Sequence, residues 1–372
     1  MINAHAHIFN VKCAPDRFYG FPVARFFSHV PGAARRLARW LRVINPFSNQ
    51  DMLERYAKMI EVGAEKTQRN IFVQLLEYYQ AYPNAKIVAL TLDMDYMGAG
   101  TAVNNYVTQL NEVADLKAQF PDQLIAFFCV DPRRPNVLAL LKEYVEHRGF
   151  TGIKLYPALG FFPFDQALLP VYEYAIGKNL PILTHCDIGG IYYRGPLSGE
   201  HLAPASLNPH VPRRNFVPHA EAKRNKFKDF FSDPRNFEDV LTLPQFAELK
   251  ICLAHYGGSE MIEGKARTLT NHNWYQSIRQ MMQTYSQVYT DLSYTLHHTH
   301  DAVRVPVVND IRHPQLRNKI LFGTDYYMTV REKDEPTLVE DFKNKYGLTA
   351  AEFDHISITN NRAFLTTRFY QP

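Results

Sequence analysis

The sequence opens with Met1-Ile2-Asn3-Ala4-His5-Ala6-His7, a short, mostly apolar run that ends in two histidines one residue apart. Such a run predicts a short strand. Side chains alternate along a strand, so His5 and His7 should point to the same side, about 6–7 Å apart. Two imidazoles placed in this way can bind one divalent cation. Because a His-x-His pair also occurs by chance, this interpretation depends on the rest of the chain.

Similar short runs recur along the chain and alternate with longer amphipathic stretches. The runs that predict strands are 2–7, 86–93, 124–131, 152–156, 181–186, 250–255, 288–293 and 319–325. The helix-like stretches between and after them are 52–79, 103–119, 136–147, 166–178, 237–248, 273–287, 302–313 and 337–346. Eight strands, each followed by a helix, predict a closed α/β barrel, the (β/α)₈ TIM barrel, as one domain over residues 1–372. An open doubly wound sheet is the alternative, but no glycine-rich phosphate-binding turn follows the first strand.

Two connections, about 11–50 and 187–233, are much longer than the usual 2–6 residues. They follow strands one and five at their carboxyl ends, where barrel enzymes build lids, so we expect both insertions to form a lid over the barrel top. The first contains a basic amphipathic stretch, 33–42, that could lie on a membrane surface. A short helix packed over the barrel with its arginines in water is the favoured interpretation.

Composition limits the class of protein. Of the 372 residues, 46% are hydrophobic and 21% charged, which is typical of a globular chain. A net charge of +4 is too small to predict nucleic-acid binding and suits a small anionic substrate. The four cysteines show no CxxC spacing, and no apolar run reaches the about 20 residues of a membrane span. Since no leader fits before His5, we expect a cytoplasmic protein without a membrane partner; a homo-oligomer is left open.

Later strand-like runs also end in a residue that can bind metal or transfer protons. Lys154, His185, His255 and Asp325 lie at or near the ends of predicted strands four, five, six and eight. In a barrel these ends form one ring around a single pocket. An ionisable group at the tip of an apolar strand is costly to desolvate unless it is paired or bound to metal. We therefore expect these side chains to form one site with His5 and His7.

The chemistry of this set suggests a metal centre. Three imidazoles and one carboxylate suit one divalent ion, with Zn²⁺ favoured and Mn²⁺, Fe²⁺ or Co²⁺ as alternatives. A catalytic metal leaves one position open for water, and a further histidine beside it can act as general acid or base.

These motifs together resemble the amidohydrolase superfamily, and within it the single-metal amidohydrolase 2 group that includes aminocarboxymuconate-semialdehyde decarboxylase. The resemblance extends over nearly the whole chain and rests on HAHIF at 5–9, GIKLYP at 152–157, PILTHCD at 181–187, ICLAHYGG at 251–258, VYTDLSY at 288–294, LFGTDYY at 321–327 and TNNRAFL at 359–365. It implies that His5, His7, His185 and Asp325 are metal ligands, and that His255 is catalytic. The chain departs from the pattern at Asn3, where an acid often precedes the His-x-His, and in the length of the 187–233 insertion.

Other residues have more than one interpretation. Lys154 either binds a substrate carboxylate or, as in two-metal relatives, is carbamylated and bridges two metals. Arg194, with Tyr192, either clamps an anion or lies on the surface. Asp291 is expected to support the site or to pack. His297, His298 and His300 form a local cluster that is expected to be a solvated loop.

The predicted activity is hydrolysis of an amide, ester or lactone carbonyl in a small carboxylate-bearing substrate. In this scheme Asp325 accepts the proton of water, and His255 stabilises the oxyanion or protonates the leaving group. The alternative is non-oxidative decarboxylation of an aromatic or unsaturated acid at the same metal. A non-catalytic barrel that binds a partner is a third hypothesis, which the complete set of ligands disfavours.

Overall fold

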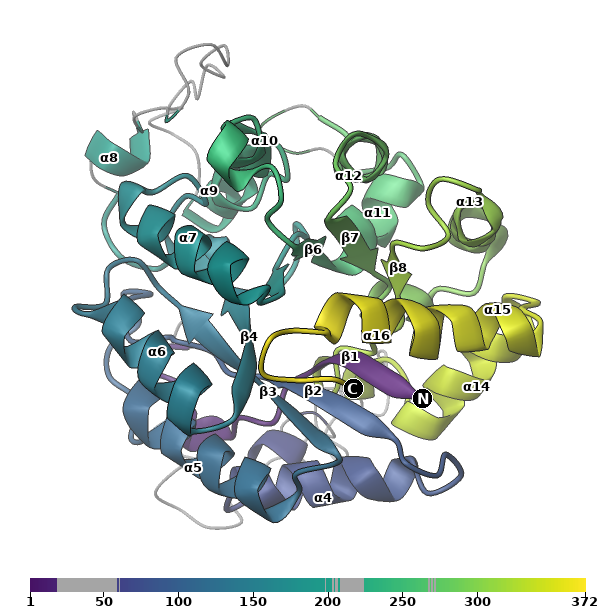
Figure 1. The fold of residues 1–372 in the computed structure, drawn as a ribbon, viewed down its shortest axis with the longest axis horizontal. Helices are drawn as coiled ribbons and strands as arrows, with labels where there is room; N and C mark the ends of the chain where they lie inside the picture. The colour runs from purple at the N-terminus through teal and green to yellow at the C-terminus, as the bar shows by residue number, and fades with distance from the viewer. Residues whose placement is uncertain are drawn as a thin grey trace, which may run out of the picture.

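The computed structural model describes residues 1–18, 59, 61–197, 199–202, 204, 207, 224–266, 268, 270 and 272–372. Eight parallel strands form one sheet in the order β1 to β8 (Figure 1). The strands are β1 Ile2–Ala6, β2 Lys86–Leu90, β3 Leu124–Val130, β4 Phe150–Leu155, β5 Ile182–Thr184, β6 Ile251–Leu253, β7 Val288–Asp291 and β8 Ile320–Leu321. The amide of Ala4 donates to the carbonyl of Phe322 at 3.0 Å, and Ala6 forms a parallel bridge with Tyr326. The sheet is therefore nearly closed, and the predicted (β/α)₈ barrel is confirmed.

Helices surround the barrel and cover one of its ends (Figure 1). The longer ones are α4 Gln68–Tyr78, α5 Tyr106–Gln119, α6 Val137–His147, α7 Leu169–Lys178, α12 Trp274–Thr284, α13 Asp301–Arg312 and α14 Glu335–Lys345. The shorter ones are α8 Gly199–Leu202, α9 Arg224–Phe231, α10 Asn236–Leu241, α11 Ser259–Ile262, α15 Ala350–Asp354 and α16 Asn360–Leu365.

Several helices begin directly after a residue whose side chain caps them, and this explains their boundaries. Thr67, Asn105, Asn273 and Asp334 each accept a hydrogen bond from the backbone near the start of α4, α5, α12 and α14. Within the predicted helix 52–79, residues 59 and 61–63 are helical, a turn follows at 64–67, and α4 begins at Gln68 after the Thr67 cap. Residues 52–58 and 60 lie outside the described residues. The predicted helix 237–248 divides into α10 and a 3-10 turn, η4 Pro244–Phe246, because proline lacks the N–H that would continue α10.

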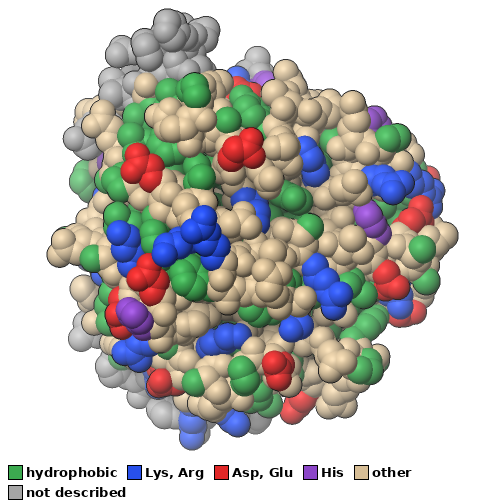
Figure 2. Space-filling view, viewed as in Figure 1, with side chains coloured by type: hydrophobic (Ala, Val, Ile, Leu, Met, Phe, Trp, Pro, Cys, Tyr) green, Lys and Arg blue, Asp and Glu red, His purple; other side chains and the backbone are tan. Residues whose placement is uncertain are grey.

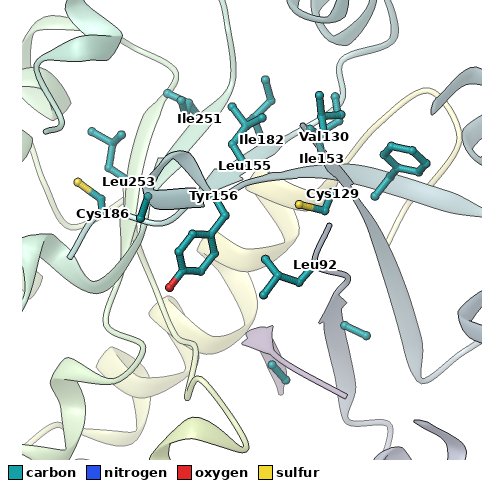
Figure 3. Close-up of a cluster of buried hydrophobic side chains, with 14 of the residues drawn as sticks. Leu92, Cys129, Val130, Ile153, Leu155, Tyr156, Ile182, Cys186, Ile251 and Leu253 are labelled. Atoms are coloured by element: carbon teal, nitrogen blue, oxygen red, sulfur yellow. The ribbon is translucent and has the colours of Figure 1, made fainter. Parts of the chain in front are cut away.

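The apolar core has two parts, one inside the barrel and one between the barrel and its helices. Side chains from neighbouring strands fill the outer layer, including Ile153 and Leu155 on β4, Ile182 on β5 and Leu253 on β6 (Figure 3). The inner cluster contains Ile2, Ala4, Val88, Leu90, Ile125, Phe127, Leu183, Cys252, Ala254, Tyr289 and Leu321, together with Phe364 and Leu365 of α16. Thus α16 closes the amino-terminal end of the barrel and leaves the carboxyl end for the site (Figure 1).

A register shift in β1 decides where its histidines point. The pairing of β1 with β2 shifts between Asn3 and Ala6. Ala4 lies in the inner cluster, whereas Ala6 lies in the outer one, although a regular strand would place both on one face. A bulge of this kind re-aims the following side chains. It brings His5 and His7 into the barrel mouth while Asn3 faces the helices.

Basic and acidic side chains are interspersed over the face shown in Figure 2, in line with the small net charge. Among the described residues, no helix combines the length and apolar character needed to cross a membrane.

Replacing Gly152 by alanine should destabilise the barrel. A Cβ on Gly152 of β4 would lie 2.3 Å from the Phe127 ring, which is fully buried on β3. Overpacking of this kind costs about 1–3 kcal/mol of unfolding free energy. Gly177→Ala is the matched control, because a Cβ there meets nothing within 4 Å on helix α7, and it should stabilise by roughly 0.5–1 kcal/mol. Chemical denaturation of both variants measures the two effects, and equal stabilities would contradict the prediction.

Candidate metal centre

Three potential metal ligands meet at the carboxyl end of the barrel. Suitable ligand atoms of His5, His7 and Asp325 lie within 4.8 Å of one another, and all three residues are buried. Oδ1 of Asp325 is 3.6 Å from Nε2 of His5 and 3.4 Å from Nε2 of His7. Neither His5 Nε2 nor Asp325 Oδ1 has a hydrogen-bond partner within the described part of the chain. Buried polar atoms are rarely left unpaired, so this arrangement fits a cation.

The other ring nitrogen of each histidine is held by the protein. Nδ1 of His5 is 2.9 Å from Oδ2 of Asp291, and Nδ1 of His7 is 3.2 Å from the carbonyl of Leu90. In each case Nδ1–H donates, which leaves the Nε2 lone pair directed at Asp325. Burial lowers the pKa of His5 to about 3, with Lys154 as the next cause, so the ring is neutral as a metal ligand must be.

Asp291 at the end of β7 connects three strands. Its carboxylate accepts from His5 and from the backbone amides of His255 (2.9 Å) and Ser293 (3.0 Å), and also from the Ser293 hydroxyl. Burial alone would raise the pKa of Asp291, but His5 and His255 hold it below its usual value. Asp291 therefore supports His5 as an ionised partner, in line with the expected supporting role.

The backbone at the ends of β6, β7 and β8 adopts conformations that non-glycine residues rarely show. Outside glycine, positive φ angles among the described residues occur at Asn84, Asn136 and Asn179, and at His255 (65°), Tyr256 (52°), Tyr294 (61°) and Asp325 (61°). Asparagine, aspartate and histidine adopt this region more often than other side chains, whereas Tyr256 and Tyr294 are more strained there. The surrounding packing holds all of these residues in place. Such strain gathers at functional sites, and here it sets the direction of His255 and Asp325.

His255 lies between His5 and His185. Its ring centroid is 4.9 Å from that of each, and its Nε2 is 3.1 Å from Nδ1 of His185. Its Nδ1 is 3.0 Å from the carbonyl of Ser293 and 2.9 Å from its hydroxyl. A second group of potential ligands joins His5, His255 and Asp291. The structure thus brings His255 to the centre of the site.

His185 is in the site but does not belong to the groups of closely spaced ligand atoms found among the described residues. Its Nε2 lies 3.3 Å from the carbonyl of Gly189, and its ring stacks on Tyr156 with 4.2 Å between centroids. The backbone of Gly190, with φ of 82°, lies against the Tyr156 side chain. A Cβ on residue 190 would lie 2.4 Å from the Tyr156 hydroxyl, so glycine allows this contact. The predicted role of His185 as a ligand stays a prediction.

Tyr156 was not identified from the sequence as a site residue, although it stands two residues after Lys154, the spacing of one strand face.

Lys154 is fully buried and lies next to the candidate metal ligands. Its Nζ is 5.6 Å from the Tyr156 ring and has no hydrogen-bond partner in the described part of the chain. Burial lowers its pKa to about 8, while the charges of Asp291 and Asp325 act in the opposite direction. Burial also raises the pKa of Asp325 to about 7, opposed by His255 and Lys154. Lys154 therefore places a cationic group among the candidate ligands.

Arg194 and Tyr192 have contacts within the chain. The guanidinium of Arg194 lies 4.5 Å from the Tyr192 ring centroid and donates to the Phe18 carbonyl at 2.8 Å. The Arg194 amide donates to the Met97 carbonyl at 2.7 Å. These bonds tie the start of the second insertion to the loops after β1 and β2. Substrate binding by Arg194 and Tyr192, and a lid formed by the insertions, stay predictions, and the basic stretch 33–42 lies outside the described residues.

A buried polar network supports β1 and β8 from the helix side. The Asn3 amide donates to Thr324 Oγ1 at 2.7 Å and to Tyr79 Oη at 3.0 Å. The hydroxyls of Tyr79 and Thr324 both donate to Oε1 of Glu335, at 2.6 and 2.7 Å. Glu335, on α14, was not anticipated from the sequence. It places a carboxyl beside Asn3, the position at which the chain departs from the expected acid.

The histidines after β7 form a separate cluster. The rings of His297 and His298 are 3.8 Å apart, and those of His298 and His300 are 5.6 Å apart. Burial is the main cause that lowers the pKa of His298 to about 4, and the nearby imidazoles of His297 and His300 lower it further. His297 and His298 are half-buried and His300 is exposed, so the loop is in part solvated, as expected.

Fold and site together define the class: a (β/α)₈ barrel with histidines and an aspartate gathered at its carboxyl end, where barrel enzymes have their active sites. Residues 2–366 match the amidohydrolase family, and the chain belongs to this family.

Several solved structures share the fold at low sequence identity. 5-Carboxyvanillate decarboxylase from Novosphingobium aromaticivorans, complexed with manganese and 4-hydroxy-3-methoxy-5-nitrobenzoic acid, is 13% identical over 98% of this chain and 94% of that chain, with a TM-score of 0.55. 2,6-Dihydroxybenzoate decarboxylase from Rhizobium is 14% identical over 98% and 99%, with a TM-score of 0.52. An uncharacterised TIM-barrel protein from Bordetella bronchiseptica is 14% identical over 98% of both chains, also with a TM-score of 0.52. No curated protein matches the chain.

Glu335→Gln should change how stability depends on pH. Burial raises the pKa of Glu335 from 4.5 to about 7, opposed by the hydrogen bonds of Tyr79 and Thr324. Between these two values the native chain holds a proton that the unfolded chain has lost, so wild-type stability falls as pH rises through this window. Glutamine keeps an oxygen acceptor and does not ionise. As pH rises from 5 to 8, the free energy of unfolding of the variant should therefore increase relative to that of wild type. The expected change is roughly 1.4 kcal/mol for each unit of difference between the native and unfolded pKa values of Glu335.

Denaturant unfolding at both pH values measures this difference. Glu340→Gln, at an exposed position of the same helix, controls for the change in formal charge. A stability difference between Glu335→Gln and wild type that is the same at pH 5 and pH 8 would contradict the prediction.

Proposed function

We propose that the protein is a metal-dependent hydrolase that acts on a carbonyl of a small, carboxylate-bearing substrate. The observation that carries the proposal is the cluster of His5, His7 and Asp325, in which His5 Nε2 and Asp325 Oδ1 are buried, 3.6 Å apart and without hydrogen-bond partners in the described chain. A divalent cation bound there would polarise a carbonyl and activate water near neutral pH. Two imidazoles and a carboxylate suit Zn²⁺ best, with Mn²⁺, Fe²⁺ and Co²⁺ as alternatives.

His185 is proposed to complete the ligand set. When His255 donates Nδ1–H to the Ser293 carbonyl, its Nε2 accepts from Nδ1–H of His185, and Nε2 of His185 then has a free lone pair. That nitrogen now faces the Gly189 carbonyl, an acceptor with which a lone pair cannot form a hydrogen bond. A small turn of the ring away from this carbonyl would make it available to a cation.

The same contacts suit His255 for proton transfer. In the other tautomer, Nε2–H of His255 donates to Nδ1 of His185, and Nδ1 of His255 becomes an acceptor that the Ser293 hydroxyl reaches only by turning away from Asp291. The two tautomers place the exchangeable proton on either side of the ring, as a general acid or base requires. Asp325 is proposed to accept the proton of the attacking water, because burial brings its pKa to about 7.

Lys154 is proposed to attract the anionic substrate. Its ammonium is buried beside the candidate ligands, where a carboxylate would meet a positive charge in a medium of low polarity. Arg194 and Tyr192 would act farther out, at the edge of the second insertion. This positive charge is the reason to propose a carboxylate-bearing substrate. Which substrate it is depends on the residues that line the pocket.

Decarboxylation of an aromatic or unsaturated acid is the second candidate. It is favoured by the position of Lys154: a carboxylate drawn to this lysine would itself lie at the candidate metal ligands, and the carbon that bears it could take a proton from His255. Two structures of the same fold are described as decarboxylases, and one of these was solved with manganese and a nitrobenzoic acid.

Substitutions at His185 and His255 should have different effects on metal content. Protein purified without added metal should carry about one tightly bound equivalent, most of which His185→Ala should lose because a ligand is missing. His255→Asn should keep this metal but lose roughly 10²–10⁴-fold in rate. Elemental analysis and steady-state kinetics measure the two properties.

His147→Gln, at an exposed position on α6, is the control for histidine substitution as such. Loss of metal from His255→Asn as large as that from His185→Ala would assign His255 to the ligand set. Full activity of metal-free wild type would refute the metal-dependent mechanism.

The reaction itself can be decided with a panel of substrates. Small lactones, amides and N-acyl amino acids should be hydrolysed by the zinc-loaded protein, with proton release followed in a pH-stat. Hydroxybenzoates are assayed in parallel for CO₂. Release of CO₂ from an aromatic acid, with no hydrolysis anywhere in the panel, would replace the hydrolase by the decarboxylase.

A further inference from the structure

A second group of metal-competent side chains lies apart from the barrel centre. Ligand atoms of Glu263, His298 and His300 are all within 4.8 Å of one another. Glu263 follows α11, and the two histidines belong to the loop between β7 and α13. We propose that these three residues form a second divalent-cation site, selective for zinc-like ions.

The spacing of the side chains fits coordination. Nε2 of His300 lies 3.1 Å from Oε1 of Glu263. Ligand atoms about 2.0–2.2 Å from a tetrahedral zinc ion are separated from one another by roughly 3.3–3.6 Å, so this pair needs to open by only a few tenths of an ångström. Two imidazoles and one carboxylate, with a fourth position for water, form a ligand set that binds Zn²⁺ in preference to Mg²⁺ or Ca²⁺.

The fold holds the group together through contacts that leave the proposed ligand atoms in place. The carbonyl of His298 accepts from the Tyr346 hydroxyl at 2.7 Å, and that of His297 accepts from Lys333 Nζ at 3.2 Å. His300 is the N-cap residue of α13, so the start of that helix fixes its position. The backbone therefore anchors the loop and directs both imidazoles toward Glu263.

The carboxylate is oriented as well. Oε2 of Glu263 is bound by Lys265 Nζ at 2.5 Å, which turns Oε1 toward His300. The side chain of Glu263 is only 8% exposed, whereas that of His300 is 49% exposed. A cation could thus enter from the solvent on the His300 side and reach a carboxylate with little exposed surface.

A simple ion pair between His300 and Glu263 is the competing explanation. A pair with one partner half exposed contributes little to stability, about 0–1 kcal/mol. It also leaves the third residue without a role, although His298 offers a ligand atom to the same point. A shared cation accounts for all three.

A cation at this site would join two segments that follow neighbouring strands. α11 begins four residues after His255, and the loop with His298 begins just after Ser293. The bound ion would therefore stiffen the support of the barrel site without contacting its reacting atoms. Because the ligands are partly exposed and only three in number, this site should fill only when Zn²⁺ is added.

Zinc titration of the full-length protein tests the proposal. After dialysis against Zn²⁺, wild type should hold about one equivalent more than His298→Gln/His300→Gln, whatever the barrel site contains. Zinc should also raise the melting temperature of wild type more than that of the double variant, because the ion binds only the folded chain. His147→Gln should behave as wild type.

Glu263→Gln is the second variant, since it preserves shape but removes the anionic ligand, and it should lose the same equivalent. The proposal fails if wild type and both variants bind equal zinc with equal shifts in melting temperature. It also fails if the extra equivalent disappears in Lys154→Met and not in the His298 and His300 variants, which would place the second ion on a carbamylated lysine. Loss of the first, tight equivalent in His185→Ala is a separate result that tests the barrel centre alone.

Discussion

The structure of the site depends on one buried carboxylate, Asp291. It lies inside the barrel, where an ionised group without partners would be very costly. Its partners are the imidazole of His5, the amide of His255 and both the amide and the hydroxyl of Ser293. A single charge therefore holds the ends of β1, β6 and β7 in one arrangement. The same bond selects the tautomer of His5 that leaves Nε2 for a cation.

The closure of the barrel positions the remaining residues around this carboxylate. The bulge in β1 and the bonds of His5 with the segment after β8 bring both histidines beside Asp325. The positive φ angles of His255 and Asp325 cost conformational energy that the packed barrel offsets. The proposed reacting groups thus lie on β1 or in the segments that directly follow β1, β5, β6 and β8. This arrangement is what allows one fold to support many reactions.

The two decarboxylases compared above are 13% and 14% identical to the chain, a similarity that establishes architecture and not chemistry. Under the proposed function, one metal centre could serve water attack on a carbonyl or loss of CO₂, depending on where the substrate carboxylate lies. We propose that Lys154, together with Tyr192 and Arg194 after β5, would set that position. The pocket wall, and not the candidate ligands, would then decide the reaction.

The sequence alone determined the barrel, because alternating short apolar runs and amphipathic stretches are local patterns that burial imposes. It also indicated the strand-end residues, since the carboxyl ends of parallel strands must converge. Some missed features carried local signals: Thr349 and Glu352 form a capping box that begins α15, and Tyr156 follows Lys154 at the spacing of one strand face.

Tertiary structure decided the rest. The bulge between Asn3 and Ala6 is a matter of pairing with β2 and leaves no mark in β1 itself. Asn3 donates a hydrogen bond to Glu335, which is 332 residues away in the chain. Glu263 contacts His300 only because α11 packs beside α13. Contacts of this kind follow from how separate elements pack, and no local pattern of residues specifies them.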